Sequence, residues 1–526
     1  MLVTNIYIFA FCALLAIGFL FRKNNTVNGS KIVDVWFCIA VTLIVSTFFS
    51  LFPLTRTYTY ADSSVFLYIG KMMQKGLVPY RDLFDHKGIL LYFIQYLGIL
   101  LYSDGFLGIW ILEVVHMLFT VWFLFKISGL FTEDKMIRYL TVIAVAVMCG
   151  MNTYEGGNFT EEYALPWITF ALYVFLKYFK EFSYKRCDIM WLGVGFATVA
   201  LLRVNMVTVW IAFMPLILIH MLYKHEMKEL TKCIVSFLTG ACLICIPVLI
   251  YTIATGSLKE FIDCYLVFNF GYSDGGSNFE AVKNAIGECI QNLSWAFAAG
   301  IIALFPNRKN RIFWLNLWAL VITLYFSHMS GRYYQHYGMI LLPMLVALIT
   351  GAVTVLYDIL SLREKISFKM KFPDKKIMIS GFILAIFAAF FLQYKWANLI
   401  REPMLQTGGV KELQEYLIEN TSEEDDVLIV GNDVKYYLLA DRSTDNKYFY
   451  QTPPIKLSDE VYQGFMEEVE RCQSDTIVVM GNKSECLERE DNLGRACSYF
   501  ENQALDGKYL CQEFENYYIY TKVERD

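Results

Sequence analysis

The chain has 526 residues, of which 56% are hydrophobic, 17% aromatic and 18% charged, and its formal net charge is −5. The charged fraction lies below the roughly 25% of an average soluble protein, and apolar runs recur from residue 2 to about residue 394. This composition excludes an ordinary soluble enzyme. Neither half of the chain has the basic stripe that nucleic-acid binding requires, so we expect no nucleic-acid partner.

The apolar runs predict about twelve transmembrane helices. Roughly 20 apolar residues are needed to cross the hydrocarbon core of a bilayer, and several runs are shorter than this. The first run lacks a basic segment before it and is followed by Arg22 and Lys23, so we interpret it as a retained helix and not a cleaved signal peptide. The predicted spans are 2–21, 32–54, 106–127, 138–151, 163–179, 189–202, 205–223, 232–254, 292–306, 312–329, 336–357 and 377–394.

The distribution of positive charge predicts the orientation of these spans. Six alternate loops carry most of the Lys and Arg of the membrane region, and positive loops stay in the cytoplasm. The segment 88–102 is apolar but short, and a full span there would invert every later loop, so we expect a helix in the outer interface. The remaining loops then face outward from the cytoplasmic membrane: the first loop with Asp62, the loop 154–162, the segment 255–291 and the turn 331–336.

Residues 395–526 differ in character from the rest of the chain. They contain 14 Lys and Arg against 27 Asp and Glu, whereas residues 1–394 contain 31 and 23. Short apolar runs at 426–430, 476–480 and 517–521 read as strands that alternate with helical patterns. We therefore predict a catalytic membrane region over 1–394, with its site in the outer loops, and an extracytoplasmic α/β domain over 395–526.

Acidic residues in two outward loops suggest acid–base chemistry. Asp62 lies just outside a predicted span and has the chemistry of a general base that accepts a proton from a hydroxyl. Glu161 and Glu162 belong to a loop with three acids and no cation. Negative charge at the start of a helix explains this pair by the helix dipole alone. The functional alternative is a second acid that positions a sugar hydroxyl or binds a divalent cation.

Asp85, His86 and Lys87 follow one another at the predicted interface. The long cationic side chain of Lys87 suits a lipid phosphate there, although snorkelling at the interface explains an isolated lysine equally well. The acid and the histidine beside it favour a site. We therefore predict that these three residues bind the phosphate of a lipid-linked substrate.

Three further residues with cationic or hydrogen-bonding side chains lie at outer helix ends. Arg203 interrupts a helical hairpin, where an arginine is costly unless it is paired. Arg332 has the geometry to grip a phosphate bidentately, and His336 can donate a hydrogen bond to one. Together, a base for a hydroxyl and cations for a leaving phosphate suit sugar transfer from a polyprenyl-phosphate donor that enters from the bilayer.

The chain resembles the GT-C membrane glycosyltransferases, especially the branch of the protein O-mannosyltransferases (family 39) and the aminoarabinose transferases. The resemblance rests on Asp62 in the first outer loop and on the stretches PYRDLFDHKG at 79–88, GGNFTEEY at 156–163 and GRYYQHY at 331–337. It implies an inverting transfer to a cell-envelope acceptor, with Asp62 as the base. The chain departs from many relatives in having Gly88, and not proline, after the lysine. The resemblance leaves the choice between Glu161 and Glu162 open.

Other functions compete with this hypothesis. If the chain were a flippase or transporter of a polyprenyl-linked glycan, we would expect charged residues near the midplane of the bilayer and internal repeats. The polar residues of this chain lie instead at the outer ends of the predicted spans. A glycan polymerase or ligase needs a lipid-pyrophosphate oligosaccharide. A receptor built around the acidic tail predicts that Asp62 is dispensable.

Overall fold

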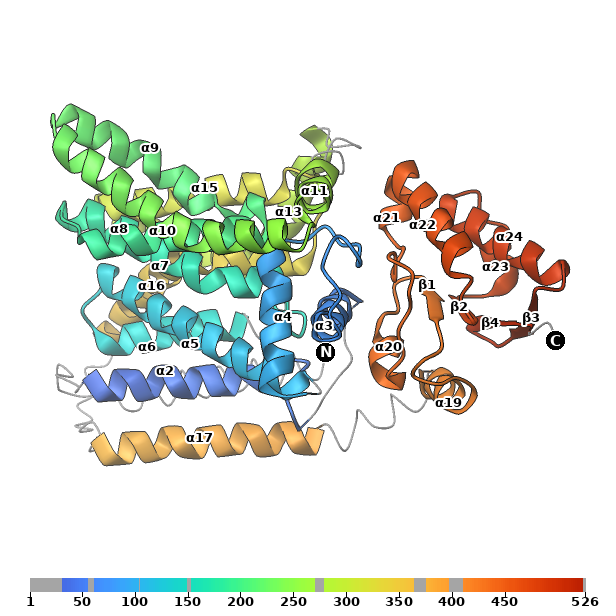
Figure 1. The fold of residues 1–526 in the computed structure, drawn as a ribbon. Coiled ribbons are helices and arrows are strands. Elements are labelled where there is room, and N and C mark those ends of the chain that lie inside the picture. Colours follow the sequence, from blue (N-terminus) through green and yellow to red (C-terminus); the bar gives the residue numbers. More distant parts are fainter. Residues whose placement is uncertain are drawn as a thin grey trace.

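The computed structural model describes residues 31–54, 61–103, 105–148, 153–269, 279–363, 375–396 and 410–523. Its larger part is a bundle of helices that run along one direction (Figure 1). The predicted span 2–21 lies outside the described residues. The bundle contains α2 (Lys31–Ser46), α5 (Phe106–Phe131), α6 (Lys135–Met148), α7 (Thr160–Glu181), α8 (Arg186–Leu202), α9 (Thr208–Tyr223), α10 (Met227–Ala254), α14 (Ser294–Asn307), α15 (Arg311–His328), α16 (Leu342–Arg363) and α17 (Lys375–Trp396).

Each of the other predicted spans overlaps one of these helices. Several predicted boundaries differ from the structure, and two of the larger differences are informative. Helix α2 ends at Ser46, eight residues before the predicted end at residue 54, and the predicted start at residue 336 falls in the 3-10 helix η4 (Gln335–Leu341) that precedes α16. Both differences occur at the end of the bundle that carries the candidate site. At this end, turns follow α2 and the 3-10 helix η4 precedes α16, so the backbone does not continue as α-helix at either position.

Three helices within the described residues are long and apolar enough to cross a membrane: Phe106–Phe131, Met227–Ala254 and Gln335–Ile359. A fourth span results if α13 (Phe279–Asn292) and α14, which are bent by 81° at their junction, count as one. The predicted number of twelve is therefore not confirmed, because the other helices are shorter or less apolar. Several of these helices nevertheless expose large apolar side chains, as helices in contact with lipid do.

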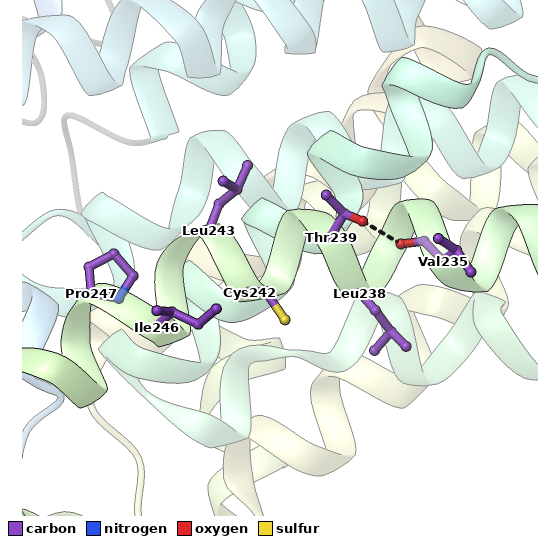
Figure 2. Close-up of a pocket in the computed structure, with 7 residues that line it drawn as sticks. All are labelled: Val235, Leu238, Thr239, Cys242, Leu243, Ile246 and Pro247. Carbon is purple, nitrogen blue, oxygen red and sulfur yellow. Dashed lines mark hydrogen bonds between the residues drawn. The ribbon is translucent and has the colours of Figure 1, made fainter.

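The outward face of α10 shows this property (Figure 2). Seven of its side chains line a shallow apolar pocket on the surface of the bundle. The one hydroxyl among them, that of Thr239, donates to the Val235 carbonyl of the same helix at 2.8 Å, so it needs no water. The pocket lacks ionisable groups apart from a thiol, and we interpret it as lipid-facing surface. It is lined by Val235, Leu238, Thr239, Cys242, Leu243, Ile246 and Pro247.

Short helices cover one end of the bundle. They are α3 (Ala61–Gln74), α4 (Ile89–Leu101), α11 (Leu258–Phe261), the π-helix η3 (Ile262–Val267) and α13. Figure 1 shows α4 running across the bundle helices, as expected for a helix that lies in the interface. Glycines allow α4 to pack closely, because a Cβ on Gly108 of α5 would collide with the backbone of Gly98.

The C-terminal unit is a four-stranded sheet with helices, and it lies at the same end as α3 and α4 (Figure 1). The strand order is β1-β2-β4-β3: β1 (Val427–Val430) pairs parallel to β2 (Thr476–Met480), and β4 (Tyr517–Lys522) lies antiparallel between β2 and β3 (Tyr509–Glu513). Strand β3 was not predicted, because its exposed pattern lacks an apolar run. The helices are α19 (Val410–Asn420), α20 (Lys435–Ala440), α21 (Pro454–Leu457), α22 (Asp459–Cys472), α23 (Lys483–Leu487) and α24 (Asn492–Leu505).

Candidate active site

The loop between α3 and α4 is organised around the buried carboxylate of Asp85, which is 1% exposed. Its Oδ2 accepts a hydrogen bond from the Tyr92 hydroxyl at 2.7 Å, and its Oδ1 accepts from the Tyr450 hydroxyl at 2.6 Å and from the His86 amide at 2.7 Å. Burial favours the neutral acid, but the charge of Lys87 and the two tyrosine hydroxyls lower the pKa of Asp85 below its ordinary value. These contacts show that Asp85 anchors its neighbours, and direct binding of a phosphate by Asp85 stays a prediction.

Asp85, His86 and Lys87 lie side by side in the loop, and we call these three residues the lysine row. The Lys87 ammonium lies 3.1 Å from His86 Nε2, and His86 Nδ1 lies 3.4 Å from Asp85 Oδ1. Because an ammonium only donates, Nε2 must be the acceptor and Nδ1 carries the imidazole proton. Burial, with the charge of Lys87, lowers the pKa of His86 to about 3. Burial disfavours the Lys87 ammonium, but Asp85 and Asp62 raise the pKa of Lys87 above its ordinary value, which keeps it cationic.

The neutral state of His86 predicts a pH dependence of stability. The unfolded chain protonates this histidine below about pH 6.5, whereas the native protein does so only near pH 3. The unfolded state thus binds the extra proton in this window, and stability falls as the pH falls through it. We expect His86→Gln to gain about 1–2 kcal/mol relative to the wild type between about pH 7.5 and pH 5. Thermal unfolding of the purified proteins measures the difference.

The matched control for this experiment is His225→Gln, which alters an exposed histidine in the turn between α9 and α10. Its stability difference from the wild type should stay constant over the same pH range. A constant difference for His86→Gln as well would contradict the assignment of a buried neutral imidazole at this position.

Asp62 lies in the first turn of α3 and is half-buried. It interacts electrostatically with Lys87, which places the two side chains in one region. No described donor forms a hydrogen bond with the Asp62 carboxylate, in contrast to the saturated carboxylate of Asp85. A carboxylate without an internal donor is available to accept a proton from a substrate hydroxyl.

Arg203 follows the last residue of α8 and forms the closest ion pair of the region. One guanidinium nitrogen pairs with the Glu161 carboxylate, and the other donates to the Tyr337 hydroxyl at 2.6 Å. The guanidinium also lies over the Tyr337 ring, 4.4 Å from its centroid. The charge of Arg203 interacts with both His86 and Lys87, so the ion pair of Arg203 and Glu161 lies near the lysine row. The sequence predicted the need for a partner but did not identify Glu161 or Tyr337 as that partner.

Glu162 has different contacts from Glu161. Its Oε2 accepts from the Asn158 amide at 2.7 Å, and it lies beside Glu113 of α5, which is fully buried. A Cβ on Gly157 would lie 2.5 Å from one oxygen of Glu113 and 3.2 Å from one of Glu162, so both acids border this glycine. Successive residues of a helix project in different directions. The structure therefore separates the pair: Glu161 meets the arginine and Glu162 lies beside Glu113, and a catalytic role for either acid stays a prediction.

Asn158 links the acidic loop to the helix that carries Asp62. Its side-chain amide donates to Ser63 Oγ at 2.8 Å, and its carbonyl oxygen accepts from Gln95 at 2.6 Å and from Tyr163 at 2.7 Å. Ser63 is the neighbour of Asp62, so this buried network holds the start of α3. This role could not be predicted from the local sequence pattern, because Ser63, Gln95 and Asn158 lie far apart in the chain.

His336 and Arg332 lie on the connection between α15 and α16. His336 Nδ1 is 2.7 Å from Glu155 Oε2, and its ring stacks on Phe159 with centroids 4.4 Å apart. His336 interacts electrostatically with Glu161, which places His336 near the ion pair of Arg203 and Glu161. Arg332 is half-buried in the loop that leads into η4. Within the described part of the chain, no three His, Cys, Asp or Glu side chains are arranged to hold a metal ion.

Comparison with known proteins places the chain in a family and gives its fold. A family model described as the N-terminal domain of putative competence-induced protein Ccs4 matches residues 23–398. The chain belongs to this family. No curated protein matches the sequence. The Ccs4 match includes every predicted site residue, from Asp62 to His336.

Two solved structures share the fold of this Ccs4 family member. ArnT from Cupriavidus metallidurans bound to undecaprenyl phosphate has 12% identity and a TM-score of 0.56, with 92% of this chain and 97% of that chain covered. The apo structure of the same ArnT has 10% identity and a TM-score of 0.58, with 94% and 98% covered. The broader prediction of a largely helical fold like that of these structures is therefore confirmed.

Proposed function

We propose that the chain is a membrane glycosyltransferase that moves a sugar from a polyprenyl-phosphate donor to a cell-envelope acceptor. The observation that carries the proposal is the meeting of Asp62, Lys87 and Arg203 in one electrostatically coupled region at an end of the bundle. A carboxylate without a hydrogen-bond donor among the described residues, beside two cations, matches a base and a phosphate site. The shared fold with an ArnT whose structure contains undecaprenyl phosphate supports the same donor class.

In the proposed reaction, Asp62 removes the proton of an acceptor hydroxyl as its oxygen attacks the anomeric carbon of the donor sugar. The bond between that carbon and the phosphate oxygen breaks, and the electron pair leaves with the polyprenyl phosphate. Lys87 and Arg203 stabilise the charge that develops on this leaving group. Attack opposite the leaving group inverts the configuration. Glu161 holds the arginine, and His86 with Asp85 holds the lysine.

The proposed location follows from the placement of the site. The polyprenyl tail stays in the bilayer, and α3 and α4 bring the site to the end of the bundle opposite the positive loops. We propose that this end and the α/β unit beside it lie outside the cytoplasmic membrane. Arg332 and His336 come from the connection between α15 and α16, and we propose that they bind the donor phosphate or sugar from that side.

Transfer in proteoliposomes tests the proposal. The purified chain is supplied with labelled polyprenyl-phosphate monosaccharides and a cell-envelope extract, beside lipid-pyrophosphate oligosaccharides as the alternative donors. Movement of label from a monosaccharide donor into an acceptor is expected. Transfer from the oligosaccharide donors alone supports a polymerase or ligase. Passage of the intact lipid-linked sugar across the bilayer without turnover supports a flippase, and either of these two results contradicts the proposal.

A further inference from the structure

A segment of the C-terminal unit docks on the loop that carries the lysine row. We define the docking segment as residues 441–450, between α20 and α21. At one end, Asp441 forms an ion pair with Lys71 of α3 at 2.5 Å. In the middle, the Thr444 amide donates to the buried Tyr68 hydroxyl at 3.3 Å. These contacts tie the docking segment to α3, the helix whose first turn contains Asp62.

The docking segment also contacts the loop between α3 and α4 directly. The Phe84 amide donates to the Lys447 carbonyl at 2.9 Å, and the rings of Phe84 and Tyr448 pack with centroids 5.0 Å apart. The last residue of the segment, Tyr450, is 5% exposed and donates to Asp85 at 2.6 Å. A backbone hydrogen bond and a buried side-chain hydrogen bond on adjacent residues fix this loop in register with the α/β unit.

The contacts of Asp85 connect this docking to the candidate site. Tyr450 holds Oδ1 and Tyr92 of α4 holds Oδ2, so the carboxylate is fixed by one hydroxyl from each unit. The fixed carboxylate lies 3.4 Å from His86 Nδ1, and His86 Nε2 lies 3.1 Å from the Lys87 ammonium. A continuous series of polar contacts therefore runs from the C-terminal unit to the lysine.

We propose that Tyr450 is a positioning residue, through which the C-terminal unit sets the orientation of the Lys87 ammonium for a lipid phosphate. This inference rests on the proposed function, in which Lys87 binds the donor phosphate. The α/β unit is then a part of the site and not only a cover over it. Without the Tyr450 hydroxyl, the carboxylate keeps Tyr92 and the His86 amide as donors among the described residues, and its position 3.4 Å from His86 Nδ1 is less tightly fixed.

Binding of undecaprenyl phosphate to the full chain in nanodiscs tests the inference. Tyr450→Phe retains the ring and removes only the hydroxyl, and we expect binding to weaken by roughly two- to thirtyfold. The matched control is Tyr448→Phe, since that hydroxyl has no hydrogen-bond partner among the described residues and its ring packs on the same loop. The control should bind as the wild type does, which separates loss of the Asp85 contact from general damage to the docking segment.

A double-mutant comparison distinguishes positioning from a structural effect. If Tyr450 acts through the lysine, Tyr450→Phe should have no further effect in a Lys87→Gln background. Tyr450→Phe should also raise the pH below which undecaprenyl phosphate no longer binds. The reason is that Asp85 loses a donor that favours its ionised form, which raises the pKa of Asp85.

Three results would contradict either the positioning role of Tyr450 or the binding of phosphate by Lys87. Wild-type binding by Tyr450→Phe, with weakened binding by Lys87→Gln, rejects the role of Tyr450 and leaves the proposed function standing. Full binding by Lys87→Gln rejects the phosphate site itself. Equal, additive losses in both backgrounds show that Tyr450 acts on the fold and not through Lys87.

Discussion

Asp62→Asn is expected to lower sugar transfer by about 10²–10⁴-fold, the usual contribution of a general base. The amide cannot accept the proton of the acceptor hydroxyl. Binding of undecaprenyl phosphate should be unchanged or tighter in this variant, because the substitution removes a negative charge that acts on Lys87. The expected signature is therefore a loss of turnover without a loss of donor binding, measured by transfer in proteoliposomes and by binding in nanodiscs.

The matched control for Asp62 is Asp263→Asn in η3, at the same end of the bundle. Asp263 pairs with Lys259 on the exposed surface, and such pairs contribute little. This variant should transfer sugar as the wild type does. Full transfer by Asp62→Asn in a folded preparation would remove Asp62 as the base, and Glu161 would become the next acid to test.

Arg203→Met is expected to destabilise the protein by about 3–5 kcal/mol and to abolish transfer. The destabilisation arises because Glu161, which is 2% exposed, keeps its negative charge but loses the guanidinium that pairs with it. The double variant Arg203→Met/Glu161→Gln should regain most of that stability, since no buried charge remains unpaired. It should not regain transfer, because the cation for the leaving phosphate is still missing. Thermal unfolding and transfer by the two variants measure these effects separately.

An exposed ion pair provides the comparison for this experiment. Lys232 and Glu229 pair on α10 with both side chains more than 40% exposed, and Lys232→Met should change stability by less than about 1 kcal/mol. Recovery of both stability and transfer in the double variant of Arg203 and Glu161 would show that the pair is structural only. The phosphate role would then rest on Lys87 alone.

The sequence was informative where physical chemistry acts along the chain. Apolar length located the bundle helices, and alternation of short apolar strands with helical patterns located β1, β2 and β4. The short segment before Tyr102 was predicted to lie in the interface from charge placement, and α4 runs across the bundle. The number of spans was less well predicted, since helices packed inside a bundle do not need a continuous apolar surface.

The site illustrates the limit of sequence reasoning. Asp62, Lys87, Arg203 and His336 were identified because charged or polar side chains next to apolar runs need an explanation. Their partners were not: Tyr337 and Tyr92 read as belt or core aromatics, and Tyr450 belongs to another unit of the chain. The sequence also offered no means of separating Glu161 from Glu162, since neighbouring acids have the same local pattern.

The sequence by itself therefore determined the positions of most helices, and it predicted the end of the bundle at which we propose the chemistry. Only the tertiary structure decided that Glu161 meets Arg203, that Glu162 lies beside Glu113, and that Asp85 anchors the lysine row through Tyr450. The physical reason is that hydropathy and charge act on each segment locally. A buried carboxylate acquires its role from donors and cations that folding brings from distant parts of the chain.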